Sequence, residues 1–111
     1  MILPLNGSYT WGMRISPSQR LALKQQFARQ LGDDCEVRLF GSRIDDAARG
    51  GDVDLLVQCP RRVERKTWRA AQLAAGAERL LQGRKVDVLL VDPETELEPV
   101  HRAALQMGIL L

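Results

Sequence analysis

The chain has 111 residues, of which 45% are hydrophobic and 27% charged, and its formal net charge is +2. This length predicts one domain, and the composition is that of a globular protein rather than a disordered or fibrous one. The small positive charge is weak evidence for nucleic-acid binding, and a mixed solvated surface is the favoured interpretation, so direct binding of nucleic acid is not expected. No apolar stretch approaches the roughly 20 residues of a membrane span, and the N-terminus lacks a signal-peptide pattern, so we expect a cytoplasmic protein.

The first part of the chain is expected to hold an irregular segment, one helix and one strand. Residues 1–15 carry glycine, serine and threonine without periodicity. Ser16 and the proline after it are a typical cap and first position of a helix, which then runs over Pro17–Leu31 and stops at Gly32. Glu36–Phe40 alternates between polar and apolar residues, as a strand does.

The rest of the chain alternates strands with helices. We expect a strand over Asp52–Cys59, a helix over Val63–Gln82 closed by Gly83, and a strand over Val86–Val91. A last helix is expected to open at Asp92-Pro93, as cap and first position, and to end at Gly108. Its apolar stripe consists of Leu97, Val100, Ala104 and Met107. A short strand over Ile109–Leu111 is expected to follow.

This order of elements predicts the fold class. Helix, strand, strand, helix, strand and helix give an α/β (α+β) domain over residues 16–111, with a small mixed sheet of three to four strands and helices packed on it. Trp68 on the long helix is expected to pack in the core, with a partner surface as the alternative. Cys35 and Cys59 border apolar runs and are expected to be small core residues with free thiols, in no zinc-binding pattern.

A glycine and a serine, Gly41-Ser42, directly follow the first expected strand. Glycine lets the backbone approach a ligand closely, and successive N–H groups with a serine hydroxyl can hold phosphate oxygens. A plain turn has the same composition, so the pair alone leaves both interpretations open.

Three aspartates lie at the beginnings of the two later strands. Asp52 and Asp54 are two residues apart, which in a strand puts both carboxylates on one face, where a hard cation such as Mg2+ relieves their repulsion. Asp87 can join them if its strand lies beside theirs. Three carboxylates suit two metal ions and in-line phosphoryl displacement, and the third can accept a proton. The alternatives are that Asp52 belongs to the turn, Asp54 faces water, and Asp87 faces water from an edge strand.

Together these residues resemble the signature of the DNA polymerase beta-like nucleotidyltransferase superfamily. Leu39-Phe40-Gly41-Ser42-Arg43, a spacer, and Asp52-Val53-Asp54-Leu55 follow its order, and the spacer Arg43–Gly51 has nine residues. Lys85-Val86-Asp87-Val88 matches the strand with the third acid. The form Leu-Phe-Gly-Ser-Arg is similar to the minimal nucleotidyltransferase branch, and the resemblance extends from about Arg14 to the C-terminus.

The resemblance implies a reaction and a set of roles. ATP would give AMP to a hydroxyl acceptor in the presence of Mg2+, two ions of which are expected. It assigns catalysis and metal binding to Asp52, Asp54 and Asp87, and nucleotide binding to Gly41, Ser42 and Arg43.

One departure from the branch follows the Gly-Ser pair. The branch often has a second arginine two residues after the first, whereas this chain has Ile44-Asp45-Asp46 after Arg43. The lost cation puts phosphate binding and activity in doubt. Arg49 or Arg61 is an alternative source of the charge, and the basic stretch from Arg61 to Arg69 is either a solvated face or a patch for an acidic partner or RNA.

The branch also implies a partner. Its members are commonly antitoxins that silence a HEPN-type ribonuclease toxin by adding AMP to a tyrosine, as part of a homo- or hetero-oligomer. Because so small a domain has little surface for selecting an acceptor, a partner protein is expected to supply the acceptor. The main alternative is a non-catalytic binding module that sequesters a partner. Transfer to a small molecule such as an aminoglycoside is a third possibility.

Overall fold

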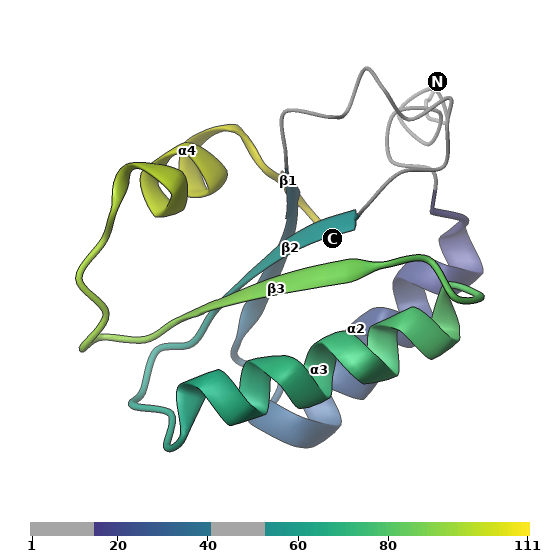
Figure 1. Cartoon of the computed structure of the whole chain (residues 1–111), viewed down its shortest axis with the longest axis horizontal. Helices are drawn as coiled ribbons and strands as arrows, with labels where there is room; N and C mark the ends of the chain where they lie inside the picture. The colour runs from purple at the N-terminus through teal and green to yellow at the C-terminus, as the bar shows by residue number, and fades with distance from the viewer. Residues whose placement is uncertain (1–14, 41–52) are drawn as a thin grey trace.

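The computed structural model describes residues 15–40 and 53–111 (Figure 1). The irregular segment predicted for residues 1–15 therefore lies, up to residue 14, outside the described part. The elements are, in chain order, α2 (Pro17–Leu31), β1 (Glu36–Phe40), β2 (Val53–Gln58), α3 (Lys66–Leu80), β3 (Val86–Val91), α4 (Pro99–Met107) and β4 (Ile109–Leu110).

The four described strands form one mixed sheet in the order β3-β2-β1-β4. β1 runs antiparallel to both β2 and β4, whereas β2 and β3 are parallel and are joined by the crossover helix α3. α2 and α3 cover one face of the sheet, and α4 lies over the other (Figure 1). This arrangement confirms the predicted fold class, a small mixed α+β sheet with helices packed on it.

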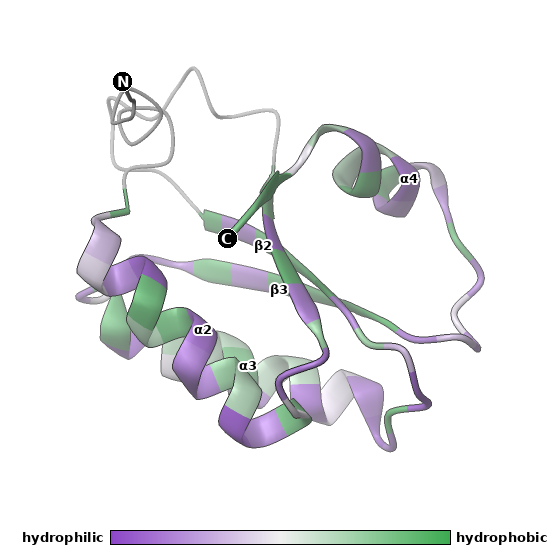
Figure 2. Cartoon of the chain, turned by 180° about the vertical axis from the view of Figure 1, so that it is seen from behind, coloured by the Kyte–Doolittle hydropathy of each residue, from purple (hydrophilic) through white to green (hydrophobic). Residues whose placement is uncertain are grey.

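The main core lies between the sheet and the pair α2 and α3. Alternate residues of the central strand β2, Val53, Leu55 and Val57, point to this side and are at most 1% exposed. The intervening Leu56 points to the other side and packs in a smaller cluster around Ala104 of α4. Because both faces of β2 are covered, the strand is almost continuously apolar. Figure 2 shows the matching division of the helices into hydrophobic and hydrophilic sides.

The first helix begins and ends as predicted. The Ser16 hydroxyl accepts a hydrogen bond from the Gln19 N–H at 3.1 Å, and the Gln19 side chain accepts one from the Ser16 N–H at 3.0 Å. These reciprocal bonds satisfy two N–H groups that have no partner within the helix. Gly32 follows the helix with φ 100°, a conformation that favours glycine.

The crossover helix is shorter than predicted. We expected Val63–Gln82, but α3 begins at Lys66, and the Val63 N–H before it donates to the Asp92 carboxylate at 2.8 Å. Arg65 then adopts a left-handed backbone with φ 54°. At the other end, Gln82 and Gly83 have φ values of 62° and 88°, which turn the chain back towards β3 before Gly83 can close the helix.

The last helix begins later than predicted. Asp92-Pro93 does not open it; Glu98 precedes Pro99 as its cap, and the Glu98 N–H donates to Nδ1 of His101 at 2.9 Å. Of the expected apolar stripe, Ala104 is buried, but Val100 and Met107 are 46% and 77% exposed. Leu97 packs against the cluster around Ala104 but precedes the helix, which has only nine residues and meets the sheet on its Ala104 side.

Trp68 is not a core residue. It is 45% exposed, and the guanidinium of Arg65 lies 4.4 Å from the centre of its ring. The buried side of α3 is centred on Leu73, and five helical positions place Trp68 about 140° away around the helix axis. The cysteines agree better with expectation, because Cys59 is buried in the main core and Cys35 packs against it.

None of the helices within residues 15–40 and 53–111 combines the length and the apolar character that a membrane crossing requires.

Candidate functional site

Asp54 and Asp87 lie side by side on neighbouring strands. β2 and β3 are parallel, and their register pairs Asp54 directly with Asp87. Both side chains project to the α4 side, since Leu56 and Leu89, two residues further along each strand, pack in the cluster on that side. Adjacent strands are about 4.8 Å apart, so the register brings two carboxylates close together on one face.

The two aspartates differ in exposure. Asp54 is half-buried near the start of the central strand β2, whereas Asp87 is exposed on β3, an outer strand of the described sheet. Asp87 therefore faces water from an outer strand, as one alternative had it, and it also lies beside Asp54, as expected. A carboxylate held by a rigid strand and open to solvent can receive a ligand without any rearrangement of the core.

Phe40 completes the row across the sheet. It is the last residue of β1 and is paired with Asp54. Its side chain is half-buried against the cluster below α4. The sequence interpretation treated Phe40 only as part of a strand. The register of β1 and β2 places it beside Asp54, and that register is not readable from the sequence.

The other predicted site residues lie outside the described part of the chain. Gly41, Ser42 and Arg43 directly follow Phe40, and Asp52 directly precedes Val53, the first residue of β2. Their roles therefore stay predictions.

The donor set of the pair suits a hard divalent cation. Carboxylate oxygens are the ligands that Mg2+ prefers, and Mg2+ is usually bound by one or two protein carboxylates together with substrate phosphates. Within residues 15–40 and 53–111 no group of three or more histidine, cysteine, aspartate or glutamate side chains could hold a metal ion. Asp54 and Asp87 thus fit as two ligands, with Asp52 as the predicted third.

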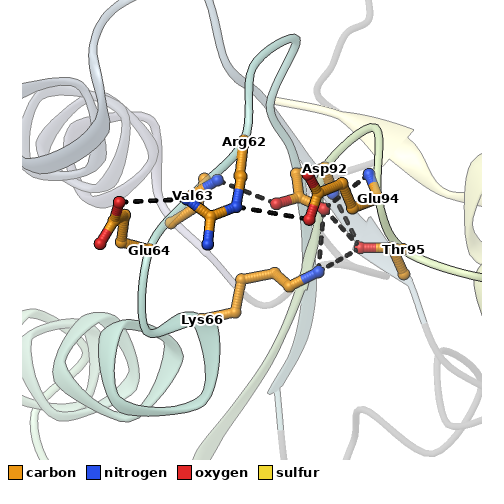
Figure 3. A network of polar contacts seen from close by, with 7 residues as sticks. All are labelled: Arg62, Val63, Glu64, Lys66, Asp92, Glu94 and Thr95. Carbon is orange, nitrogen blue, oxygen red and sulfur yellow. Dashed lines mark hydrogen bonds and ion pairs between the residues drawn. The ribbon is translucent and has the colours of Figure 1, made fainter.

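A second polar cluster lies at the opposite end of β3 and surrounds Asp92 (Figure 3). The Asp92 carboxylate is buried and accepts hydrogen bonds from Lys66 Nζ and the Val63 N–H, each at 2.8 Å. It also accepts bonds from the Glu94 N–H and the Thr95 hydroxyl, each at 3.0 Å. The hydrogen bond from Lys66 is the main cause that holds the pKa of Asp92 well below its usual range.

Asp92 is therefore a structural residue rather than a helix cap or part of the site. It ties the beginning of α3 to the end of β3. It lies five positions after Asp87, a distance of about 16 Å along the strand.

Most charges of the basic stretch are neutralised by neighbouring acids. Arg62 lies 3.0 Å from Glu64 and 3.3 Å from Glu94. Arg61 lies 2.7 Å from Asp34, and hydrogen bonding between the two raises the pKa of Arg61 and lowers that of Asp34. These pairs favour a solvated face over a basic patch.

The same pairing removes Arg61 as a source of the missing phosphate-binding charge. Arg61 follows the end of β2, whereas Asp54 lies near its beginning. Its guanidinium is occupied by Asp34 at that far end, so the alternative that named Arg61 is wrong. Arg49, the other alternative, lies outside the described residues.

Comparison with known proteins gives one match. A family model described as "Nucleotidyltransferase domain" matches residues 21–110. No curated protein and no solved structure matches the chain significantly. The matched range includes the paired aspartates and every strand of the described sheet.

Proposed function

The chain belongs to the nucleotidyltransferase domain family, and we propose that it transfers AMP from ATP to a hydroxyl group in a Mg2+-dependent reaction. The observation that carries this proposal is the register of β2 and β3, which pairs Asp54 with Asp87 on one face of the sheet. These are the two described acids that the resemblance names, and the register sets them beside each other.

The proposed roles follow from charge and exposure. Asp54 and Asp87, with the predicted Asp52, would hold Mg2+. When bound, Mg2+ supplies positive charge that offsets the charge of the triphosphate and of the departing pyrophosphate. Gly41, Ser42 and Arg43 are the predicted contacts of the triphosphate.

The exposed carboxylate on β3 is suited to proton transfer. The acceptor hydroxyl oxygen forms a bond to the α-phosphorus, and the bond from this phosphorus to the β-phosphate oxygen breaks, releasing pyrophosphate. The hydroxyl proton passes to a carboxylate. Asp87 is open to solvent and hence to an incoming acceptor, whereas Asp54 is half-buried. We assign the proton-accepting role to Asp87 for this reason.

We further propose that the acceptor is a tyrosine hydroxyl of a HEPN-type ribonuclease toxin and that the chain is its antitoxin. The support for this is the resemblance of Leu39-Phe40-Gly41-Ser42-Arg43 and of the three aspartates to the minimal nucleotidyltransferase branch.

The test is a labelling experiment with ATP carrying radioactive phosphorus at the α or at the γ position. The protein is incubated with each form, Mg2+, and the product of the neighbouring gene. Label from α-labelled ATP alone should appear on the partner, because pyrophosphate carries the γ-phosphorus away. Label from the γ-labelled form would show phosphorylation instead and would overturn the proposal.

Two variants locate the activity. Asp54→Asn keeps the shape of the side chain but removes its charge, and it should abolish labelling. Asp33→Asn is the matched control, because Asp33 is exposed in the turn after α2, away from the proposed site. Tight binding of the partner without label, equal in both variants, would support the non-catalytic binding module.

A further inference from the structure

Cys35 and Cys59 face each other at the end of the β1–β2 ladder. The last paired residues of this antiparallel ladder are Glu36 and Gln58. Cys35 directly precedes the first and Cys59 directly follows the second, so one more step of the same register sets the two cysteines opposite each other. Both side chains project to the α2 and α3 side and pack in or against the main core.

The backbone hydrogen bonds around Cys35 and Cys59 show whether they form a hydrogen-bonded or a non-hydrogen-bonded pair of the antiparallel ladder. The Val37 carbonyl accepts from the Leu111 N–H at 2.9 Å, so the polar groups of Val37, and by alternation those of Cys35, point away from β2. The Cys59 N–H donates to the Val91 carbonyl at 2.8 Å, away from β1. Cys35 and Cys59 therefore form a non-hydrogen-bonded pair, in which Cα atoms are about 4.5 Å apart. Disulfides span Cα separations of about 4.4–6.8 Å.

The two thiols interact but differ in access. Burial raises the pKa of the Cys59 thiol to about 12, and its hydrogen bond with the Cys35 thiol adds to the effect. Cys59 is 3% exposed. Cys35 is half-buried and lines a groove between α2 and β1, beside Gly32 and Glu36. A small reagent can thus reach Cys35 first, with Cys59 held directly behind it.

We propose that Cys35 and Cys59 are a redox-active pair that forms a reversible intramolecular disulfide by exchange with a small-molecule disulfide. The Cys35 thiolate attacks one sulfur of the reagent, which leaves a mixed disulfide and one released thiolate. The Cys59 thiol passes its proton to the released thiolate, and the Cys59 sulfur attacks the Cys35 sulfur, which releases the second half of the reagent. Both cysteines are oxidised, and the reagent is reduced to two thiols.

The cross-link joins β1 to β2 at the end remote from Asp54. Cys59 lies five positions after Asp54, a distance of about 16 Å along the strand. The disulfide should therefore stabilise the β1–β2 unit while leaving the proposed transfer reaction unchanged. Closing the chain between positions 35 and 59 should raise the melting temperature by about 10 °C.

The experiment uses the full chain and mixtures of reduced and oxidised glutathione. Intact mass after acid quenching should show loss of two hydrogen masses, with no thiol left for a maleimide in denaturant. Peptide mapping should identify a Cys35–Cys59 link in monomeric protein, and dithiothreitol should restore both thiols. The oxidised protein should melt at the higher temperature.

The single variants provide the controls. Cys35→Ser should leave Cys59 almost unreactive while the protein is folded, whereas Cys59→Ala should retain a glutathione adduct on Cys35. Three results would overturn the proposal. They are a persistent adduct on Cys35 of the unaltered chain with Cys59 still free, a disulfide-linked dimer, and a cross-link that forms only in denaturant.

Discussion

Replacing Asp87 by asparagine should stabilise the metal-free protein and, at the same time, remove its activity. The register of β2 and β3 pairs Asp87 with Asp54 on adjacent strands, whose backbones lie about 5 Å apart. Two unit charges at that separation repel by about 0.8 kcal/mol at the dielectric constant of water and by about 3 kcal/mol at an effective value of 20. Because Asp87 is exposed, the lower figure applies. Asp87→Asn should therefore raise the unfolding free energy without metal by about 1 kcal/mol.

The effect on function should have the opposite sign. Loss of a carboxylate that accepts the acceptor's proton should lower the transfer rate by about 10²–10⁴. Mg2+ should stabilise the unaltered chain, because a ligand that binds only the folded state shifts the unfolding equilibrium, and this gain should shrink in the variant.

Urea denaturation with and without Mg2+, together with the labelling assay, measures all three quantities. Asp33→Asn, which removes an exposed charge outside the pair, is the control and should change none of them beyond a few tenths of a kcal/mol. The reasoning would be refuted if Asp87→Asn destabilised the metal-free protein while labelling continued at the original rate.

Three further predictions concern stability. Leu55→Ala should lower the unfolding free energy by about 2–5 kcal/mol in urea denaturation, because Leu55 is 0% exposed on the central strand; no change would mean that β2 is not central. Gly32→Ala should cost about 1–3 kcal/mol by the same measurement, since φ 100° is unfavourable for alanine, and an equally stable variant would contradict this backbone conformation. The lowered pKa of Asp92 means that its stabilising contribution is complete above the unfolded value of about 3.9 and is lost as the pH falls below it. Melting temperatures at pH 7 and at pH 3 should thus differ less in Asp92→Asn than in the unaltered chain, and an equal difference would exclude this role.

Local patterns were sufficient where neighbouring residues along the chain make the deciding contacts. The α2 helix has the predicted bounds because its capping box and terminal glycine lie within its own sequence. The strands were readable for a similar reason, because alternation or a continuous apolar run reports how many faces of a strand are covered. The two-residue spacing of Asp52 and Asp54 also predicts a shared face, and this stays a prediction because Asp52 lies outside the described residues.

Long-range contacts decided what local patterns could not. Asp92 looked like a helix cap, but its carboxylate binds the Val63 N–H and Lys66 Nζ, about 30 positions earlier in the chain, and α4 begins later, after Glu98. Trp68 looked like a core residue, but the orientation of α3 is set by Leu73 and leaves the indole in solvent.

The pairing of Asp54 with Asp87, and the meeting of Cys35 with Cys59, depend on the order and direction of strands in the sheet. Sequence alone predicted which residues carry the chemistry, since residue type and spacing along one strand are local properties. Only the tertiary structure decided which of them meet, because strand register is fixed by the packing of the whole core.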